Sequence, residues 1–400
     1  MTRAFIDIVS FAREHRDDDP LRLLLQQQKY PDIDVRLVVQ QLEGQRQALA
    51  KWPTLACCEG YFYPPRLNRE QSSSEATARY KAGLFEALGG GTLADLTGGM
   101  GVDVYFMSRQ ARHTDYYEVD ADLCAIAEYD FAVLGAENIT CHCRDSLQQA
   151  DFPFSDMVFI DPARRDSLGR KVSAFEDCKP DILTHLQMLR GCCRHLLVKA
   201  SPMIDLQLAA SQLERVEEVH VVALNGECKE VLFLLRGADT TEGASNPVIH
   251  CADIDGCGFK PRWEYSFTWE EEAASVPIFA SEVEAYLYEP TASLMKGGCY
   301  NSICRWFDVK KLARNTHLYT SSRLIEDFPG RIFAVRQQIA LNAKEIHRHI
   351  PEGMGHVVTR NFPLSAATLQ RQLKLREGGH LFILAATLGS RPAGWLCERL

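Results

Sequence analysis

The 400-residue sequence predicts an α/β protein whose central sheet is mainly parallel and carries helices on both faces. Between residues 92 and 200, short apolar segments alternate with segments of helical periodicity, which is typical of strands joined by helical crossovers. Asn225-Gly226 separates two later apolar segments and predicts a hairpin, so the last strand should run antiparallel to the others. Helical spacing over residues 1–70 and mixed patterns after residue 247 predict an N-terminal helical region and C-terminal α+β domains.

The N-terminal region carries clear helix signals. Asp19 is suited to the N-cap and Pro20 to the first position of a helix, and a longer apolar stripe predicts a second helix over residues 33–51. Ser72 and Glu75 have the spacing of a capping box, so a third helix is expected to follow and to end at the glycines near residue 89. The first of these helices carries three leucines: Leu21, Leu24 and Leu25.

The remaining helices and strands are predicted from apolar runs and from the turn-forming residues that separate them. Strands are expected at 93–96, 115–119, 139–143, 157–160, 195–199, 220–224 and 230–235. Helices are expected between them at 102–109, 122–134 and 180–193. After a Gly-, Thr- and Ser-rich linker at 237–246, we expect helices at 334–348 and 365–375, the second capped by Ser365, and a strand at 381–386.

Composition excludes several classes of protein. Hydrophobic residues make up 46% of the chain and charged residues 24%, as in ordinary globular proteins. No apolar run approaches the roughly 20 residues of a membrane span, and no signal-peptide pattern is seen, so a soluble, cytoplasmic protein is expected. The 14 cysteines contain no Cys-x-x-Cys, and the spacing of Cys141-His142-Cys143 suits no common zinc site; reduced thiols and no metal are expected.

Charge is distributed unevenly along the chain. The formal net charge of −9 argues, taken alone, against a nucleic-acid partner. Residues 301–400 nevertheless hold 15 Lys and Arg against 7 Asp and Glu, a net charge of +8, which leaves −17 for the remainder. This asymmetry favours a basic interaction module near the C-terminus, with ordinary solvated surfaces as the alternative.

The motif Asp95-Leu-Thr-Gly-Gly-Met-Gly-Val-Asp103 lies between a predicted strand and a predicted helix. Its glycines allow close approach of the backbone to a ligand, and the helix N-terminus supplies N–H donors. A Gly-rich turn alone does not separate dinucleotide enzymes from other classes. Asp95 disfavours a pyrophosphate at this place and favours a cationic, amino-acid-like ligand, and the absence of Gly-Lys-Ser/Thr excludes a P-loop.

Carboxylates follow the next three strands as well. Glu118 can accept hydrogen bonds from both hydroxyls of a ribose, Asp145 can accept from an adenine amino group, and Asp161 begins Asp-Pro-Ala-Arg. Asp120 is better placed to cap the following helix. Because ligands of open α/β sheets bind at the carboxyl ends of the strands, these residues are expected to line one site.

These motifs resemble those of class I S-adenosylmethionine-dependent methyltransferases, which have a Rossmann-like sheet with an antiparallel last strand. The resemblance covers residues 81–236. More narrowly, the chain resembles an uncharacterised bacterial group with a C-terminal THUMP-like domain, on motifs that include residues 71–81, 161–165, 199–202, 226–230, 288–290, 328–331 and 360–363. The resemblance implies a helical region at 1–80, a methyltransferase domain at 81–240, a ferredoxin-like domain at 247–325 and a THUMP-like domain at 326–400.

The resemblance also implies roles for individual residues. Asp95 and the glycine turn would hold the methionine moiety of S-adenosylmethionine, Glu118 its ribose and Asp145 its adenine. Ser73 and Thr77 could close over the cofactor carboxylate, or could belong only to the helix cap. The expected cofactor-binding set is Asp95, Thr97, Gly98, Gly99, Gly101, Glu118, Asp145, Asp161, Ser73 and Thr77.

The residues expected to face the methyl acceptor, Asp161-Pro-Ala-Arg164, depart from the usual motif of amino-group methyltransferases, which is Asp or Asn followed by two prolines and an aromatic residue. Ala163 stands where a second proline is usual, and Arg164 replaces the aromatic residue, which argues against simple N-methylation of a base. We expect Asp161 and Lys199 to be the catalytic residues, with Asp161 as orienting acceptor and base. Lys199 could instead be an ordinary solvated strand-end lysine. Substrate contacts are expected from Arg164, Arg165 and Arg360.

The C-terminal arginines complete the functional hypothesis. THUMP-like domains accompany RNA substrates, so the resemblance implies methylation of a structured tRNA or rRNA. A methyltransferase acting on a protein or small molecule, and a non-catalytic RNA-binding protein, remain the alternatives. Convergence of Asp95, Glu118 and Asp145 on one pocket would discriminate against the non-catalytic alternative.

Overall fold

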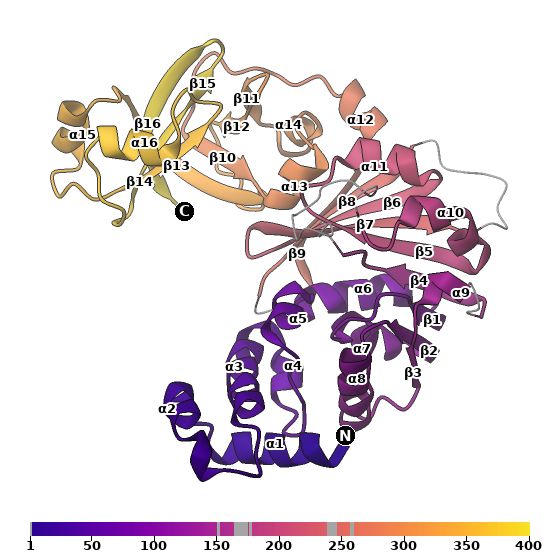
Figure 1. Ribbon diagram of the computed structural model, residues 1–400. Helices are drawn as coiled ribbons and strands as arrows, with labels where there is room; N and C mark the ends of the chain where they lie inside the picture. The colour runs from indigo at the N-terminus through magenta and orange to yellow at the C-terminus, as the bar shows by residue number, and fades with distance from the viewer. Residues whose placement is uncertain (1, 150–152, 164–174, 176–177, 238–245, 257–259) are drawn as a thin grey trace. The chain divides into compact units, whose positions relative to one another are not determined.

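A computed structural model describes residues 2–149, 153–163, 175, 178–237, 246–256 and 260–400. The described chain divides into two compact units: residues 1–224, 229–245 and 254–262 form the first, and residues 225–228, 246–253 and 263–400 form the second. Figure 1 shows the helices and strands of both. No helix within the described ranges is long and apolar enough to cross a membrane.

The N-terminal region of the first unit is helical, as predicted, and packs around its own apolar core. Val38 and Leu42 of the longest helix pack there with Leu23, and Ile126 joins the cluster from the sheet-covering part of the unit. The apolar face of the short second helix differs from the prediction, because Leu21 and Leu25 are mostly exposed and Leu23 is buried. The helices are α1 (Thr2–Glu14), α2 (Pro20–Leu25), α3 (Val35–Lys51), α4 (Pro53–Ala56), α5 (Arg66–Gln71) and α6 (Glu75–Ala87), with the short 3-10 helix η1 (Gln27–Lys29) between α2 and α3.

The sheet of the first unit alternates with helices in the predicted order. Its strands are β1 (Gly91–Asp95), β2 (Ala111–Glu118), β3 (Ile139–Cys143), β4 (Ser155–Ile160), β5 (Cys193–Ala200), β6 (Val216–Leu224) and β7 (Glu227–Arg236). The helices between them are α7 (Val102–Ser108), α8 (Ala121–Val133), α9 (Ser146–Gln149), α10 (Ile182–Gly191) and α11 (Leu206–Leu213), of which α9 and α11 were not predicted.

Strand order places the candidate site. The order is β3-β2-β1-β4-β5-β7-β6, and β1 pairs in parallel with both β2 and β4. The chain therefore reverses its direction of progress across the sheet between β1 and β4, so right-handed crossovers put α7 and α8 on one face and α10 on the other (Figure 1). β7 runs antiparallel to β5, as predicted, and Asn225 and Gly226 adopt the positive φ values of the tight turn that joins it to β6.

The second unit contains β8 (Val248–Ile254), much of β9 (Pro261–Thr268) and a separate mixed sheet. The order of that sheet is β11-β12-β10-β13-β16-β15-β14, and only β14 and β15 pair in parallel among its described strand pairs. The strands are β10 (Tyr286–Pro290), β11 (Lys310–Ala313), β12 (Thr316–Ser321), β13 (Gly330–Ile339), β14 (His356–Arg360), β15 (Leu381–Leu388) and β16 (Arg391–Arg399). The helices are α12 (Trp269–Ala274), α13 (Ala292–Gly297), α14 (Ser302–Phe307), α15 (Ala343–His349) and α16 (Ala366–Gln372).

The expected helix over residues 334–348 is wrong. Its first half is β13, which pairs with β10 on one side and β16 on the other, and only the end of the range is helical, as α15. The helix near residue 365 is confirmed as α16, capped by Ser365, whose hydroxyl accepts from the Thr368 N–H at 3.2 Å. The strand near residue 381 is confirmed as β15.

Candidate active site

The glycine-rich turn between β1 and α7 is built against an aromatic ring. A Cβ atom on Gly98 would lie 2.0 Å from Cε2 of Tyr116, so only glycine fits. The Tyr116 hydroxyl donates to the Gly99 carbonyl at 2.5 Å. Gly101 has a φ of 77°, and a Cβ there would meet Phe131 at 2.6 Å. The turn is thus fixed by packing from behind, which leaves its front face to a ligand.

Asp95 ends β1 beneath this turn. The residue is 1% exposed, and its side-chain Oδ1 accepts a hydrogen bond from the Thr97 N–H at 3.0 Å. Burial raises the pKa of the Asp95 carboxyl well above its ordinary value, although the Thr97 N–H acts in the opposite direction. A buried carboxylate with one backbone donor is suited to a cationic partner.

Glu118 ends β2 and reaches the same turn. Its Oε2 accepts from the Gly99 N–H at 2.8 Å, and its Oε1 accepts from the Asp120 N–H at 2.9 Å. A carboxylate offers about four acceptor positions, so two remain for a ligand. Asp120 caps α8, as predicted, by accepting from the N–H groups of Asp122 and Leu123.

Residues from all four strand ends line one cleft. Its volume is about 650 Å³, and Asp95, Glu118, Asp145 and Asp161 all lie along it together with the glycine turn. Asp145 Oδ1 accepts from the Leu147 N–H at 2.9 Å at the start of α9. The four predicted carboxylates therefore lie together in the structure, because parallel strands end at one edge of the sheet.

The cleft is also lined by residues that were not among the predicted site residues. Asn68, Gln71 and Ser72, at the end of α5, line it beside Lys179 and Pro180. Gln71 and Ser72 belong to the motif at residues 71–81, where Ser72 was assigned only to a helix cap, and no local pattern marks Asn68 as a site residue. The N-terminal helical region thus forms part of the wall of the cleft.

Asp161 is tied into the protein where it lines the cleft. Its carboxylate Oδ2 lies 2.6 Å from the Lys199 Nζ, and its backbone N–H donates to Thr97 Oγ1 at 2.7 Å. Lys199 also donates to Ser73 Oγ at 2.9 Å. The predicted pair of Asp161 and Lys199 is therefore in direct contact, but Lys199 is only 3% exposed and is not a solvated strand-end lysine.

A buried ion network continues behind Lys199. Lys81 of α6 lies 2.5 Å from Glu230 and 3.2 Å from Asp103, and Ser73 Oγ donates to Asp103 Oδ2 at 2.7 Å. Burial alone would raise the pKa of the Asp103 carboxyl, but Lys81 and Lys199 outweigh it and lower that pKa. Burial likewise acts against a charged Lys199, yet the carboxylates of Asp161, Asp103 and Glu230 raise its pKa above the ordinary value. Lys199 therefore remains a cation at neutral pH.

The helix cap at α6 differs from the predicted capping box. Ser74, not Ser72, is the N-cap and accepts from the Thr77 N–H at 3.2 Å. Glu75 is fully buried and instead accepts from the backbone and hydroxyl of Thr54. Ser73 lines the cleft, whereas Thr77 is buried in α6 and does not line it.

Of the three predicted substrate arginines, the structure describes only Arg360. Arg164 and Arg165 lie outside the described residues. Arg360 lies in the second unit, where it and Arg331 both pair with the buried carboxylate of Glu289. Glu289 therefore offsets one of the two positive charges that Arg331 and Arg360 carry.

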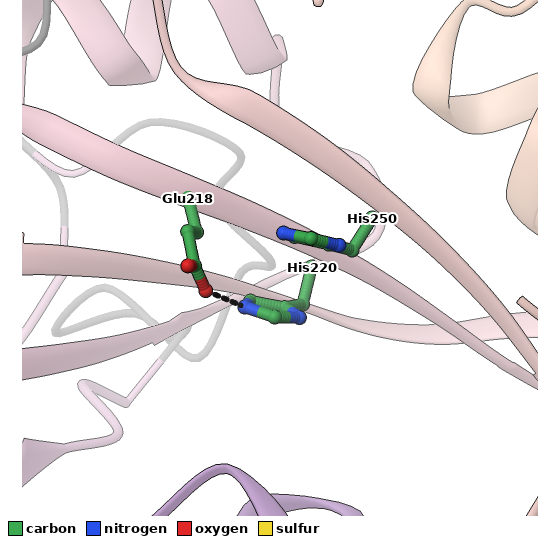
Figure 2. Close-up of side chains that lie close together, drawn as sticks. All are labelled: Glu218, His220 and His250. Carbon is green, nitrogen blue, oxygen red and sulfur yellow. Dashed lines mark hydrogen bonds and ion pairs between the residues drawn. The ribbon is translucent and has the colours of Figure 1, made fainter. Parts of the chain in front are cut away.

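A histidine on β6 lies outside the cleft. His220 is 3% exposed, and its ring lies 2.9 Å from a Glu218 carboxylate oxygen (Figure 2). The ring also lies 3.0 Å from the Tyr80 hydroxyl. Figure 2 also draws His250 of the second unit, whose Nδ1 lies 2.7 Å from Ser266 Oγ. The contact between Tyr80 and His220 links α6 to β6.

Comparison with known proteins finds two family models that match the C-terminal part of the chain. Residues 286–329 match a family model described as a ferredoxin-like domain, and residues 330–399 match one described as THUMP domain-like. The structure is similar to the crystal structure of the "putative methyltransferase" of Porphyromonas gingivalis W83, with a TM-score of 0.88 and 28% identity. That match covers 99% of this chain and 98% of the other.

The chain therefore shares the fold of that protein over nearly its whole length, and its C-terminal residues 330–399 form a THUMP-like domain. This confirms the family resemblance and the fold class expected from the sequence. Partial similarity extends to a "putative RNA methyltransferase" of Pyrococcus horikoshii (14% identity, TM-score 0.36, covering 49% of this chain and 98% of that one). It extends also to a "putative O-methyltransferase" of Klebsiella pneumoniae (12% identity, TM-score 0.34, covering 48% of this chain and 100% of that one). No curated protein matches the chain.

The two family models cover parts of one sheet. The ferredoxin-like match contains β10, β11 and β12, and the THUMP-like match contains β13 to β16. β10 pairs directly with β13 over five residue pairs, Tyr286 with Ala334 through Pro290 with Gly330. A cut near residue 326 would therefore break a continuous hydrogen-bonded sheet.

Proposed function

We propose that the protein is an S-adenosylmethionine-dependent methyltransferase that modifies a structured RNA, a tRNA or an rRNA. The observation that carries this proposal is the single cleft onto which the glycine turn and four strand-end carboxylates converge. This convergence also argues against a non-catalytic RNA-binding protein, which has no need of a nucleoside-sized site lined in this way.

The residues present fit the cofactor. The ammonium of its methionine moiety would compensate the buried charge of Asp95, and the packed glycine turn leaves room for that moiety. Glu118 retains two acceptor positions for the ribose hydroxyls, and Asp145 would accept from the adenine amino group. When bound, S-adenosylmethionine supplies an activated methyl group.

The acceptor end of the cleft would receive the substrate. Asp161 is 28% exposed at its side chain and has one oxygen engaged by Lys199, so its other oxygen can accept a hydrogen bond from the nucleophile. Holding a nucleophile in line is the main contribution required of the protein once the methyl group is activated. Replacement of Asp161 by Ala is expected to abolish methyl transfer while affinity for S-adenosylhomocysteine stays within twofold. Unchanged turnover would refute this role.

The THUMP-like domain supports RNA as the substrate. On α16 and the turn after it, Arg371, Lys374 and Arg376 are exposed and make no ion pair with any described residue. Clustered cations of this kind bind phosphates, with an affinity that falls as salt rises. The double substitution Arg371→Glu and Lys374→Glu should weaken RNA binding at least about tenfold. Arg22→Glu with Lys29→Glu, in the acidic part of the chain, makes the same charge change and should have little effect.

The deciding experiment compares modified nucleosides in total RNA from cells with and without the protein by mass spectrometry. We expect one methylated nucleoside to disappear from the cells that lack it and to return when the purified protein and S-adenosylmethionine are added to that RNA. An unchanged nucleoside profile would overturn RNA as substrate and leave a protein or a small molecule. The variant Asp161→Ala is the matched negative control.

A further inference from the structure

The buried ion network behind the cleft draws its members from separated parts of the chain. Ser73 precedes α6 and Lys81 lies in it, before the first strand of the sheet. Asp103 comes from α7, Lys199 from β5 and Glu230 from β7. Lys81 is 0%, Glu230 2% and Lys199 3% exposed. Every charged member lies within 4.0 Å of an opposite charge, and the shortest contacts are Lys81 to Glu230 and Lys199 to Asp161.

Such a network is costly to bury, and stability alone does not account for it. Two lysines and two carboxylates lose most of their hydration, and apolar side chains of similar size would often stabilise a fold as well or better. What a network of this kind can supply is a fixed orientation for the group at its end. Its end here is Asp161, which lines the cleft with a side chain that is 28% exposed; Asp103 also lines the cleft, but its side chain is only 10% exposed.

We propose that Lys199 is a positioning residue, which Ser73, Asp103 and Glu230 hold in place so that it fixes the Asp161 carboxylate as a hydrogen-bond acceptor toward the substrate. This inference rests on the proposed methyltransferase function. It makes the N-terminal helical region part of the catalytic apparatus, because Ser73 anchors both Lys199 and Asp103 and Lys81 anchors Glu230.

The geometry distinguishes positioning from direct catalysis by Lys199. Its ammonium donates to Asp161 Oδ2 at 2.6 Å and to Ser73 Oγ at 2.9 Å, and it lies 3.6 Å from Asp103 and 3.9 Å from Glu230. Its neighbours thus surround the ammonium with acceptors on the protein side. Because these carboxylates also raise the pKa of Lys199, it holds its proton and cannot serve as a base at neutral pH.

A double-mutant cycle tests the proposal. The variants are Lys199→Met, Asp161→Asn and the pair together in the full-length protein. The assay follows tritiated methyl transfer from S-adenosylmethionine to total RNA from cells that lack the protein. We expect Lys199→Met to slow transfer at least about tenfold with S-adenosylhomocysteine affinity unchanged within twofold. In the Asp161→Asn background, the same replacement should cost less than twofold, because a positioning residue acts only through the group it positions.

Two further variants keep the test decisive. Ser73→Ala removes one anchor of Lys199 without leaving an unpaired charge, so it should slow transfer by a smaller factor and keep the fold. Lys311→Met alters another buried lysine, which is 2% exposed and bonded to Asn301 in the second unit, and should leave the rate unchanged. Melting temperatures identify any variant that fails to fold.

The outcomes separate the two proposals. If the wild-type protein labels no RNA, the proposed function fails and the positioning role fails with it. If the wild-type protein labels RNA, the positioning role is overturned by either of two results: Lys199→Met and Ser73→Ala both transfer at the wild-type rate, or the losses from Lys199→Met and Asp161→Asn multiply in the double variant. Multiplied losses would mean that Lys199 acts on the substrate directly.

Discussion

Replacement of Glu118 by Gln tests the nucleoside end of the cleft. The carboxylate accepts from the N–H groups of Gly99 and Asp120 and, in the proposed complex, from two ribose hydroxyls. Gln has the same shape but only one acceptor oxygen and no charge, so the hydroxyl pair loses its charge-assisted bonds. Each such bond contributes about 1.5–3 kcal/mol.

The expected loss of affinity is about 3 kcal/mol, because the amide oxygen can still accept one bond, and this corresponds to roughly 100-fold. Isothermal titration calorimetry with S-adenosylhomocysteine measures it without a substrate. Asp122→Asn is the matched control, since Asp122 is exposed on α8, carries the same charge and does not line the cleft. A dissociation constant for Glu118→Gln within threefold of wild type, with an unchanged melting temperature, would refute the assignment of Glu118 to the ribose.

Three further predictions concern other parts of the same site. Because burial raises the pKa of Asp95, the folded state binds that proton more tightly than the unfolded chain, and stability falls as pH rises above about 4. Asp95→Asn should therefore stabilise the ligand-free protein at pH 8, as measured by urea unfolding, while weakening S-adenosylhomocysteine binding; a loss of stability at pH 8 would contradict this. Gly98→Ala should abolish cofactor binding, since the new Cβ atom would overlap the Tyr116 ring. The control Gly83→Ala lies in open space on α6 and should stabilise the protein by about 1 kcal/mol. Equal cofactor binding by Gly98→Ala and wild type would be inconsistent with the packed turn. Lys81→Met should destabilise the fold by about 3–5 kcal/mol, because Glu230 loses its closest cation, and a change below about 1 kcal/mol in urea unfolding would show that the network is not coupled to stability.

Local signals were sufficient for much of the fold. Asp19, Asp120 and Ser365 cap the helices they were expected to cap, and Asn225-Gly226 makes the hairpin turn. These features depend on one to four consecutive residues, so a sequence states them directly. The candidate site residues Asp95, Glu118, Asp145 and Asp161 were found in the same way, because each follows a recognisable strand.

Sequence signals gave the wrong helix cap, buried face or secondary structure where contacts with distant residues determine it. Three consecutive serines allow more than one cap register, and Ser74 is selected because Glu75 is drawn to Thr54. The apolar face of α2 is set by the core it meets, which takes Leu23 and leaves Leu21 in solvent. The segment that forms β13 has helical spacing, but pairing with β10 and β16 on its two sides overrides that preference.

The class of fold, the succession of strands and of most connecting helices from β1 to β7, and the four strand-end carboxylates could all be read from the amino-acid sequence. This was possible because these depend on periodicity, punctuation and the rule that parallel strands present their ends at one edge. The folded structure was needed to show that Lys199 is buried and bound to Asp161, and that Lys81 contacts Glu230, which lies 149 positions away in the chain. A lysine's surroundings depend on which distant segments fold over it, and no local pattern in the chain encodes that.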